Sequence, residues 1–373
     1  MSPRVAAIVG AYQTPLRRGV VDQSLEEMIF EAARGALADA GLSINDIDAI
    51  TFSTTDQVEG RVIESMVTNG AAGGVGRDVT TLASAGEHAL VYAYIRIKAG
   101  QARRILTVAW SKESESVNPS HADWLCAEPF LLRPLGMTSR AAAGLQASAY
   151  VSRYGFDGEA VRAVRDARAA SWAKTAGADF DAPASFDRLA AWPLTDDDLP
   201  RGCDVAAAAV MVAADAVSDD QVPAWVDGVG WISERYELGD RDLSRFDSLA
   251  AAAQMALGPN LVREVDVIEV QEISSIASFA VCEALGLAEP GEGAQVAVSG
   301  GGPVINPSGG NLPANPGNAA GYLRIVNAAQ QVRGRAGTGQ LEPRPRSAVG
   351  AAMNGFAGQS STVVLFSSEV GEN

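Results

Sequence analysis

Few side chains in this sequence are of a type that moves protons or attacks carbonyl carbon near neutral pH. There are two histidines, His88 and His121, and three cysteines, Cys126, Cys203 and Cys282. Histidine changes its charge near neutral pH, so either one is a candidate general acid or base, although a packed or exposed structural histidine is the commoner case. The cysteines lie far apart and include no Cys-x-x-Cys pair, so we expect no metal site.

The composition predicts a globular chain with a large core. Of its 373 residues, 47% are hydrophobic and 20% are charged, and the length suits two similar halves packed together. The net charge of -16 argues against a nucleic-acid partner, because binding phosphates needs a basic patch. Apolar runs fall short of the roughly 18 residues that a membrane span needs. With so few cysteines, the expected location is the cytoplasm.

Apolar runs that read as strands alternate with helical stretches, which is typical of a layered α/β fold. The clearest helix spans residues 25–40, with Ser24 as its N-cap and Gly41 after its end. An internal echo is visible, since residues 47–52 and 265–270 each follow a helix with an acidic loop and a buried strand, which favours a duplicated unit. The expected strands are 4–11, 49–53, 104–110, 205–213, 226–232, 265–270 and 361–366, and further helices are expected at 275–285 and 321–332.

The strand rhythm stops between about residues 111 and 200. This stretch is rich in proline and tryptophan and contains helical patterns at 141–154 and 159–176. It reads as a loop domain, at about residues 112–200, that either covers a site or packs a dimer. We therefore expect an N-terminal half at 1–223, which carries this loop domain, and a C-terminal half at 224–373.

Several segments occur in the order and spacing of one known family. Residues 8–15 read Ile-Val-Gly-Ala-Tyr-Gln-Thr-Pro, similar to the thiolase opening strand that ends in A-x-R-T-P. Further matches are 266–270 with 283–287 (around H-D-x-F), 305–310 (N-P-S-G-G), 314–321 (G-H-P-x-G-A-T-G) and 331–334 (Q-L-R-G). The chain thus resembles the thiolase superfamily, in its sterol carrier protein x and lipid-transfer branch. This resemblance implies a duplicated five-layer α/β/α/β/α fold, a homodimer, and a coenzyme A thioester as substrate or ligand with no other cofactor.

The sequence departs from this family at the positions that carry its chemistry. A thiolase attacks with a cysteine thiolate at a helix N-terminus, and the matching stretch 79–86 places Ala83 there. Asn315 replaces the histidine of the G-H-P motif, and Met353 replaces the general base of the C-terminal C-x-G motif. The H-D-x-F motif becomes residues 271–274, Gln-Glu-Ile-Ser. We therefore expect no Claisen chemistry.

The resemblance also nominates the residues that remain at the site. Ser84 is either a displaced nucleophile or, as we prefer, a helix-capping residue, because side-chain direction turns by about 100° per helical residue and no base is evident. Glu272 is either a general base or a buried structural carboxylate. The catalytic candidates are Glu272, Gln271, Asn315, Asn354 and His88, with the two asparagines donating to a thioester oxygen. The substrate-binding candidates are Ala83, Ser84, Gly309, Gly310, Met353 and Gly355.

Three functions stay open. The first is a retro-aldol lyase on β-hydroxyacyl-CoA of the steroid side-chain type, working with an OB-fold acyl-CoA-associated subunit; such enzymes look to carry Tyr-Asp-x-Phe at positions 271–274. The second is a companion subunit of a cysteine-bearing thiolase, or an acyl-CoA or lipid carrier. The third is an acyltransferase that uses Ser84, His88 or Cys126. In each case the pantetheine is expected to enter between the loop domain and the core.

Overall fold

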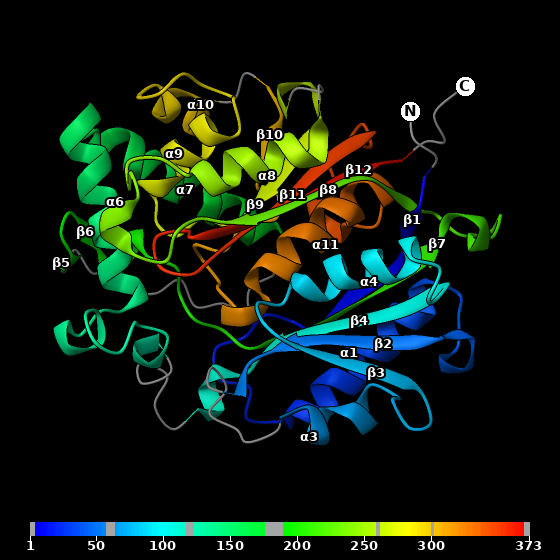
Figure 1. Ribbon diagram of the computed structural model, residues 1–373. Coiled ribbons are helices and arrows are strands. Elements are labelled where there is room, and N and C mark those ends of the chain that lie inside the picture. The colour runs from blue at the N-terminus through cyan, green and yellow to red at the C-terminus, as the bar shows by residue number, and fades with distance from the viewer. Residues whose placement is uncertain are drawn as a thin grey trace.

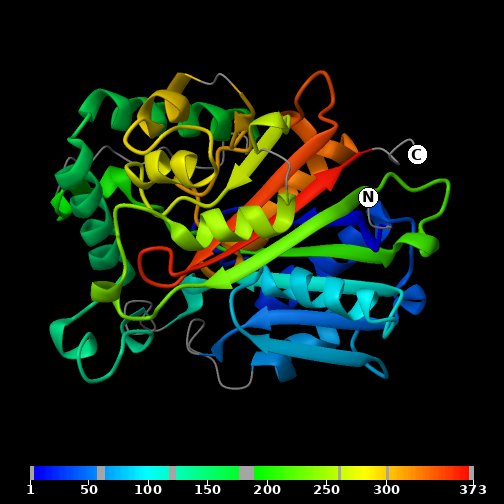
Figure 2. The same ribbon diagram turned by 45° about the horizontal axis from the view of Figure 1, so that its top comes forward.

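The computed structural model describes residues 4–56, 64–116, 123–175, 189–258, 262–299 and 302–368. Its main sheet has ten strands in the order β10-β9-β11-β12-β8-β1-β7-β4-β2-β3 (Figures 1 and 2). The first half contributes β1 (Ala6–Gln13), β2 (Ala49–Thr54), β3 (Asp78–Ala83), β4 (Arg104–Ser111) and β7 (Val205–Ala213). The second half contributes β8 (Ala224–Ser233), β9 (Val267–Val270), β10 (Val304–Ile305), β11 (Ser347–Asn354) and β12 (Ser360–Ser367).

The two halves repeat one topology. Numbered by position in the chain, the five strands of each half lie in the order 1-5-4-2-3, with the first two pairings antiparallel and the last two parallel. The two five-stranded sets are joined by a short antiparallel pairing of β1 with β8, from Ala6↔Val226 to Ile8↔Ala224. The short echo in the sequence therefore belongs to a repeat that extends over whole sheets.

Helices cover both sheets and fill the space between them. Helices α4 (His88–Lys98) and α11 (Ala320–Arg333) lie in the middle, and their buried side chains form one core cluster with strands of both halves (Figure 1). Helix α1 (Leu25–Asp39) covers the outer face of the first sheet, and α8 (Asp247–Leu257) and α9 (Ala277–Ala284) cover that of the second. Layers of helix and sheet thus alternate, as expected.

The local sequence explains the best-defined elements. Helix α1 begins with a capping box in which Ser24 and Glu27 satisfy each other's backbone N–H groups. Strand β7 is a continuous run of alanine, valine and methionine, and it is buried on both faces because it is a central strand. Both elements match the sequence-based expectation closely.

An inserted segment separates β4 from β7, where the second half has only the turn 355–359 between the matching strands β11 and β12. It holds α6 (Ser139–Tyr154), α7 (Gly158–Thr175) and the small pair β5 (Leu189–Ala191) and β6 (Leu194–Thr195). In both views it gathers at the end of the sheets opposite the two chain termini (Figures 1 and 2). We refer to it below as the loop domain.

Two strands at the site were not expected from the sequence. Strands β3 and β11 contain threonine, alanine and glycine rather than an alternation of large apolar and polar residues.

Within the described ranges, no helix is long and apolar enough to cross a membrane. The same residues contain no group of three or more histidine, cysteine or acidic side chains arranged to hold a metal ion.

Candidate functional site

Loops from both halves meet at the end of the sheets that faces the loop domain. The backbone N–H of Gly86, just before α4, donates to the carbonyl of Asn318, just before α11, at 2.9 Å. The backbone N–H of Met353, near the end of β11, donates to Oε1 of Gln271, just after β9, at 3.2 Å. These loops follow the carboxyl ends of parallel strands, which is where α/β folds place their ligand sites.

Ala83 and Ser84 lie in a different backbone setting from the one expected. Ala83 is the exposed last residue of β3, and α4 begins only at His88. Ser84 therefore lies in a turn before the helix. The change of about 100° in side-chain direction per helical residue does not apply to it there. Its Oγ is 2.6 Å from Nδ1 of His88. The interpretation of Ser84 as a capping residue without a base is therefore wrong.

His88 is half-buried, and burial lowers the pKa of its imidazole. The ring is thus neutral at pH 7, and a neutral ring can accept a proton through Nδ1. His121, the other candidate histidine, lies outside the described residues. Cys126 has an exposed surface, but its thiol is partly desolvated and lies near the negative charge of Asp123. Both effects raise the pKa of the thiol, which disfavours the reactive thiolate.

The contacts of Glu272 favour a structural role over that of a general base. Arg168 of α7 approaches both of its carboxylate oxygens, at 2.9 and 3.0 Å, and both side chains are buried. Ser278 Oγ donates to Oε1 at 2.6 Å, and Asn306 Nδ2 donates to Oε2 at 2.9 Å. With each oxygen held by two donors, this carboxylate ties the loop domain to the core and is a poor base for a substrate.

The nominated glycines and Met353 are mostly packing positions. A Cβ on Gly309 would lie 2.8 Å from Trp172, so this glycine lets α7 pack closely. A Cβ on Gly310 would lie 2.8 Å from Asn306 Nδ2 and 3.2 Å from Glu272 Oε2, so this glycine leaves room for the contacts of Glu272. The Met353 side chain belongs to the outer core cluster of the second half. Gly355 is exposed in the turn after β11 at φ +73, which favours glycine.

Asn315 holds a central place among the loops. It forms a parallel bridge with Gly202, and its carbonyl accepts from the backbone N–H of Cys203 at 3.1 Å. Its Oδ1 accepts from Asn311 Nδ2 at 3.3 Å, so the oxygen end of the amide faces the protein and the NH₂ end is left for donation. This orientation fits the predicted role of a hydrogen-bond donor to a thioester oxygen.

Glu87 was not predicted as a site residue. It is fully buried, Asn354 Nδ2 donates to its Oε1, and its Oε2 has no hydrogen-bond partner among the described residues. Burial raises the pKa of this carboxyl to about 7. A Cβ on Gly321 of α11 would lie 2.7 Å from Oε2 and 3.1 Å from Gln271 Oε1, so these two oxygens approach the same point. By accepting this hydrogen bond, Glu87 fixes the orientation of the Asn354 side-chain amide.

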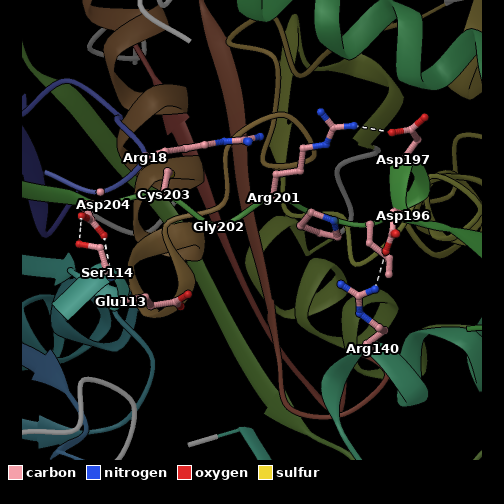
Figure 3. A pocket seen from close by; sticks show the side chains of 13 residues that line it. Arg18, Glu113, Ser114, Arg140, Asp196, Asp197, Arg201, Gly202, Cys203 and Asp204 are labelled. Atoms are coloured by element: carbon pink, nitrogen blue, oxygen red, sulfur yellow. Dashed lines mark hydrogen bonds and ion pairs between the residues drawn. The ribbon is translucent and has the colours of Figure 1, made fainter. Parts of the chain in front are cut away.

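Glu113 was also missed. It follows β4 and lines a cavity of about 500 Å³ between the loop domain and the core (Figure 3). Its Oε1 would lie 2.0 Å from a Cβ on Gly317, two residues from Asn315. Burial, and then the nearby Asp204 and Asp123, raise the pKa of its carboxyl to about 6. A half-buried carboxyl with such a pKa, facing a cavity, is suited to proton transfer near neutral pH.

Charged side chains form most of the wall of this cavity. Arg140 of α6 pairs with Asp196, and Arg201 pairs with Asp197, each at 2.5 Å. Figure 3 shows Arg18 extending from the core side toward Arg201. The cavity therefore brings three guanidinium groups from separate segments toward one space, together with the carboxylates of Glu113, Asp196, Asp197 and Asp204. A phosphate could bind there only by competing with Asp196 and Asp197 for Arg140 and Arg201.

Comparisons with known proteins agree with the fold. Residues 232–367 match the family described as Thiolase C-terminal domain-like. The acetyl-CoA acetyltransferase of Methanothermobacter thermautotrophicus is 26% identical over 359 residues, covering 91% of this chain and 94% of that protein. The solved Ltp2-ChsH2(DUF35) aldolase has a TM-score of 0.81 at 19% identity, with 99% of each chain covered. Human mitochondrial 3-ketoacyl-CoA thiolase in complex with CoA has a TM-score of 0.66 at 17% identity, with 98% of each covered.

These matches define a protein of the thiolase fold, as the sequence predicted. The family match in the second half and the acetyl-CoA acetyltransferase that is similar over most of the length support membership of the thiolase superfamily.

Proposed function

We propose that this protein is an acyl-CoA carbon–carbon lyase that cleaves a β-hydroxyacyl-CoA by a retro-aldol reaction. The observation that carries the proposal is Glu113, a carboxyl with a pKa of about 6 on the wall of the cavity, next to the loop that presents Asn315. Ala83 supplies no thiolate, so the proposal needs chemistry that proceeds without a cysteine acyl-enzyme. The structural likeness to the Ltp2-ChsH2(DUF35) aldolase also supports the proposal of a retro-aldol lyase.

In the proposed reaction, the Glu113 carboxylate takes the proton of the β-hydroxyl group. The bond between the α and β carbons breaks, the β carbon becomes a ketone or aldehyde carbonyl, and the electron pair moves into a thioester enolate. Asn315 and Asn354 donate hydrogen bonds to the enolate oxygen. The conjugate acid of Glu113 then returns the proton to the α carbon, which releases a shortened acyl-CoA. No oxidant, metal or second substrate is consumed.

The coenzyme A portion is proposed to enter through the cavity between the loop domain and the core. Arg18, Arg140 and Arg201 are proposed to contact the phosphates of coenzyme A, with Arg140 and Arg201 exchanging their partners Asp196 and Asp197 for the phosphates. Because the lining is mostly charged, this cavity suits the coenzyme better than an apolar steroid ring. A steroid-type acyl group would therefore have to lie on another side of Asn315.

Product analysis by mass spectrometry tests this function. We expect purified protein to convert β-hydroxyacyl-CoA esters, including those with sterol side chains, into a carbonyl compound and a shorter acyl-CoA without added free CoA. The incubation is repeated with an OB-fold acyl-CoA-associated subunit. If β-hydroxyacyl-CoA remains uncleaved under both conditions, the lyase proposal is wrong.

Substituting Ala83→Cys is expected not to create a thiolase. The new thiol would stand at the position of the nucleophilic cysteine of thiolases. However, Asn315 cannot shuttle a proton, and the Met353 side chain is packed in the core. The measurement is the CoA-dependent loss of β-ketoacyl-CoA, with circular dichroism as the control for folding. Robust thiolysis by this single variant would refute our description of the site.

A companion-subunit function is favoured by a separate observation. Strand β3 lies at the edge of the sheet, and none of its residues is fully buried. Nearby side chains Met66 and Val75 are 75% and 80% exposed. An unpaired edge with apolar neighbours is suited to strand pairing with a second copy or with a cysteine-bearing thiolase. Absence of turnover, together with co-purification of such a thiolase, would support this alternative.

A further inference from the structure

The turn between β3 and α4 places a hydroxyl group and an imidazole in direct contact. Ser84 Oγ lies 2.6 Å from His88 Nδ1, within the range of a nucleophile and its base. We propose that Ser84 and His88 form a nucleophile–base pair that hydrolyses acyl-CoA thioesters. This activity is independent of the proposed lyase reaction, because it acts on the thioester carbonyl and needs no β-hydroxyl group.

The backbone of this turn is held firmly. The Ser84 backbone N–H donates to the Leu82 carbonyl at 3.0 Å. Ser53 Oγ lies 3.0 Å from the carbonyl oxygen of Ser84 and 2.7 Å from that of Ala85. The Gly86 N–H bonds to Asn318 in the other half. A nucleophile fixed from both halves of the molecule needs little reorganisation to attack.

The surroundings of the pair favour a neutral, accepting imidazole. Burial is the cause of the lowered pKa of His88, so the ring is uncharged at pH 7 and Nδ1 can take the hydroxyl proton. Ser84 itself is half-buried and adjoins the exposed Ala83, which presents only a methyl group.

The chemistry balances without any external reagent except water. Ser84 Oγ attacks the thioester carbon while His88 takes its proton, and the carbon–sulfur bond breaks. The leaving thiolate receives that proton and departs as free coenzyme A, which leaves an acyl ester on Ser84. Water, deprotonated by His88, then attacks the ester and releases the carboxylic acid, which restores the hydroxyl group.

The test uses a straight-chain saturated acyl-CoA, which has no β-oxygen and therefore cannot undergo retro-aldol cleavage. We expect the full-length protein to release free thiol from this ester, measured with a thiol-reactive dye. Ser84→Ala should lower the rate at least a hundredfold, and His88→Gln should lower it at least tenfold. Ser152→Ala, at an exposed position of α6, is the matched control and should keep the wild-type rate.

Intact-mass analysis during turnover gives a second readout. Wild-type protein or the slower His88→Gln variant should carry an acyl adduct that peptide mapping assigns to Ser84. The proposal is overturned if wild-type protein releases no thiol, if Ser84→Ala retains the wild-type rate, or if the adduct lies on another residue. Assaying β-hydroxyacyl-CoA cleavage in the same variants separates the two activities, because loss of one with retention of the other identifies which proposal fails.

Discussion

Substituting Glu113→Gln is expected to lower kcat/KM for β-hydroxyacyl-CoA cleavage by about 10²–10⁴-fold, the usual contribution of a positioned general base. Glutamine keeps the shape of the side chain and its contacts beside Gly317 but cannot accept a proton. The measurement is the rate of carbonyl product formation. The matched control is Glu159→Gln, an exposed carboxylate in the first turn of α7, which should leave the rate unchanged.

The pH dependence provides an independent check. The general base acts as a carboxylate, so wild-type cleavage should fall as the pH drops through about 6, the pKa of Glu113. A carboxyl whose pKa is raised by folding stabilises the protein at low pH, and that contribution is lost as the pH rises through the folded value. Glu113→Gln should therefore be more stable than wild type at pH 8, by about 2 kcal/mol. A folded variant that cleaves at the wild-type rate would exclude Glu113 as the base.

The elements that the sequence predicted best are those with a strong local pattern. The capping box at Ser24 and the continuous apolar run of β7 each specify one structure, and both were predicted almost to the residue. Strands β3 and β11 were missed because their small and polar residues have no alternation. Ala83 was expected at a helix N-terminus because the thiolase resemblance places the nucleophilic cysteine there, but in the structure Ala83 is the last residue of β3.

Site residues could be predicted only where the family motif marked them. The motif located Ala83 and Asn315, but it carries no information about Glu87 or Glu113, whose perturbed pKa values arise from burial by distant segments. A local signal did exist for Glu113, which follows a buried strand where such folds bind ligands. The role of Glu272 could not be predicted, because its partner Arg168 lies 104 residues away in sequence.

Substituting Arg168→Ala is expected to destabilise the protein by about 3–5 kcal/mol, the usual effect of removing one partner of a buried ion pair. Glu272 would stay buried with only Ser278 and Asn306 as donors, and its charge would lose its counterion. The loop domain would also lose its buried tie to the core. Urea denaturation at pH 7 measures the change in the free energy of unfolding, and Arg162→Ala on the same helix is the control.

A double variant, Arg168→Met with Glu272→Leu, separates the structural role of this pair from a catalytic one. Replacing a buried ion pair with apolar side chains of similar volume is often neutral or stabilising, so the double variant should recover part of the lost stability. Recovery is incomplete because Ser278 and Asn306 lose Glu272 as their acceptor. If Glu272 is structural, this folded variant should also keep its C–C cleavage rate within about tenfold, because a base would contribute at least 10²-fold. A stable double variant that has lost cleavage would instead return Glu272 to the reaction as its base, and Glu113 would then have to serve another purpose.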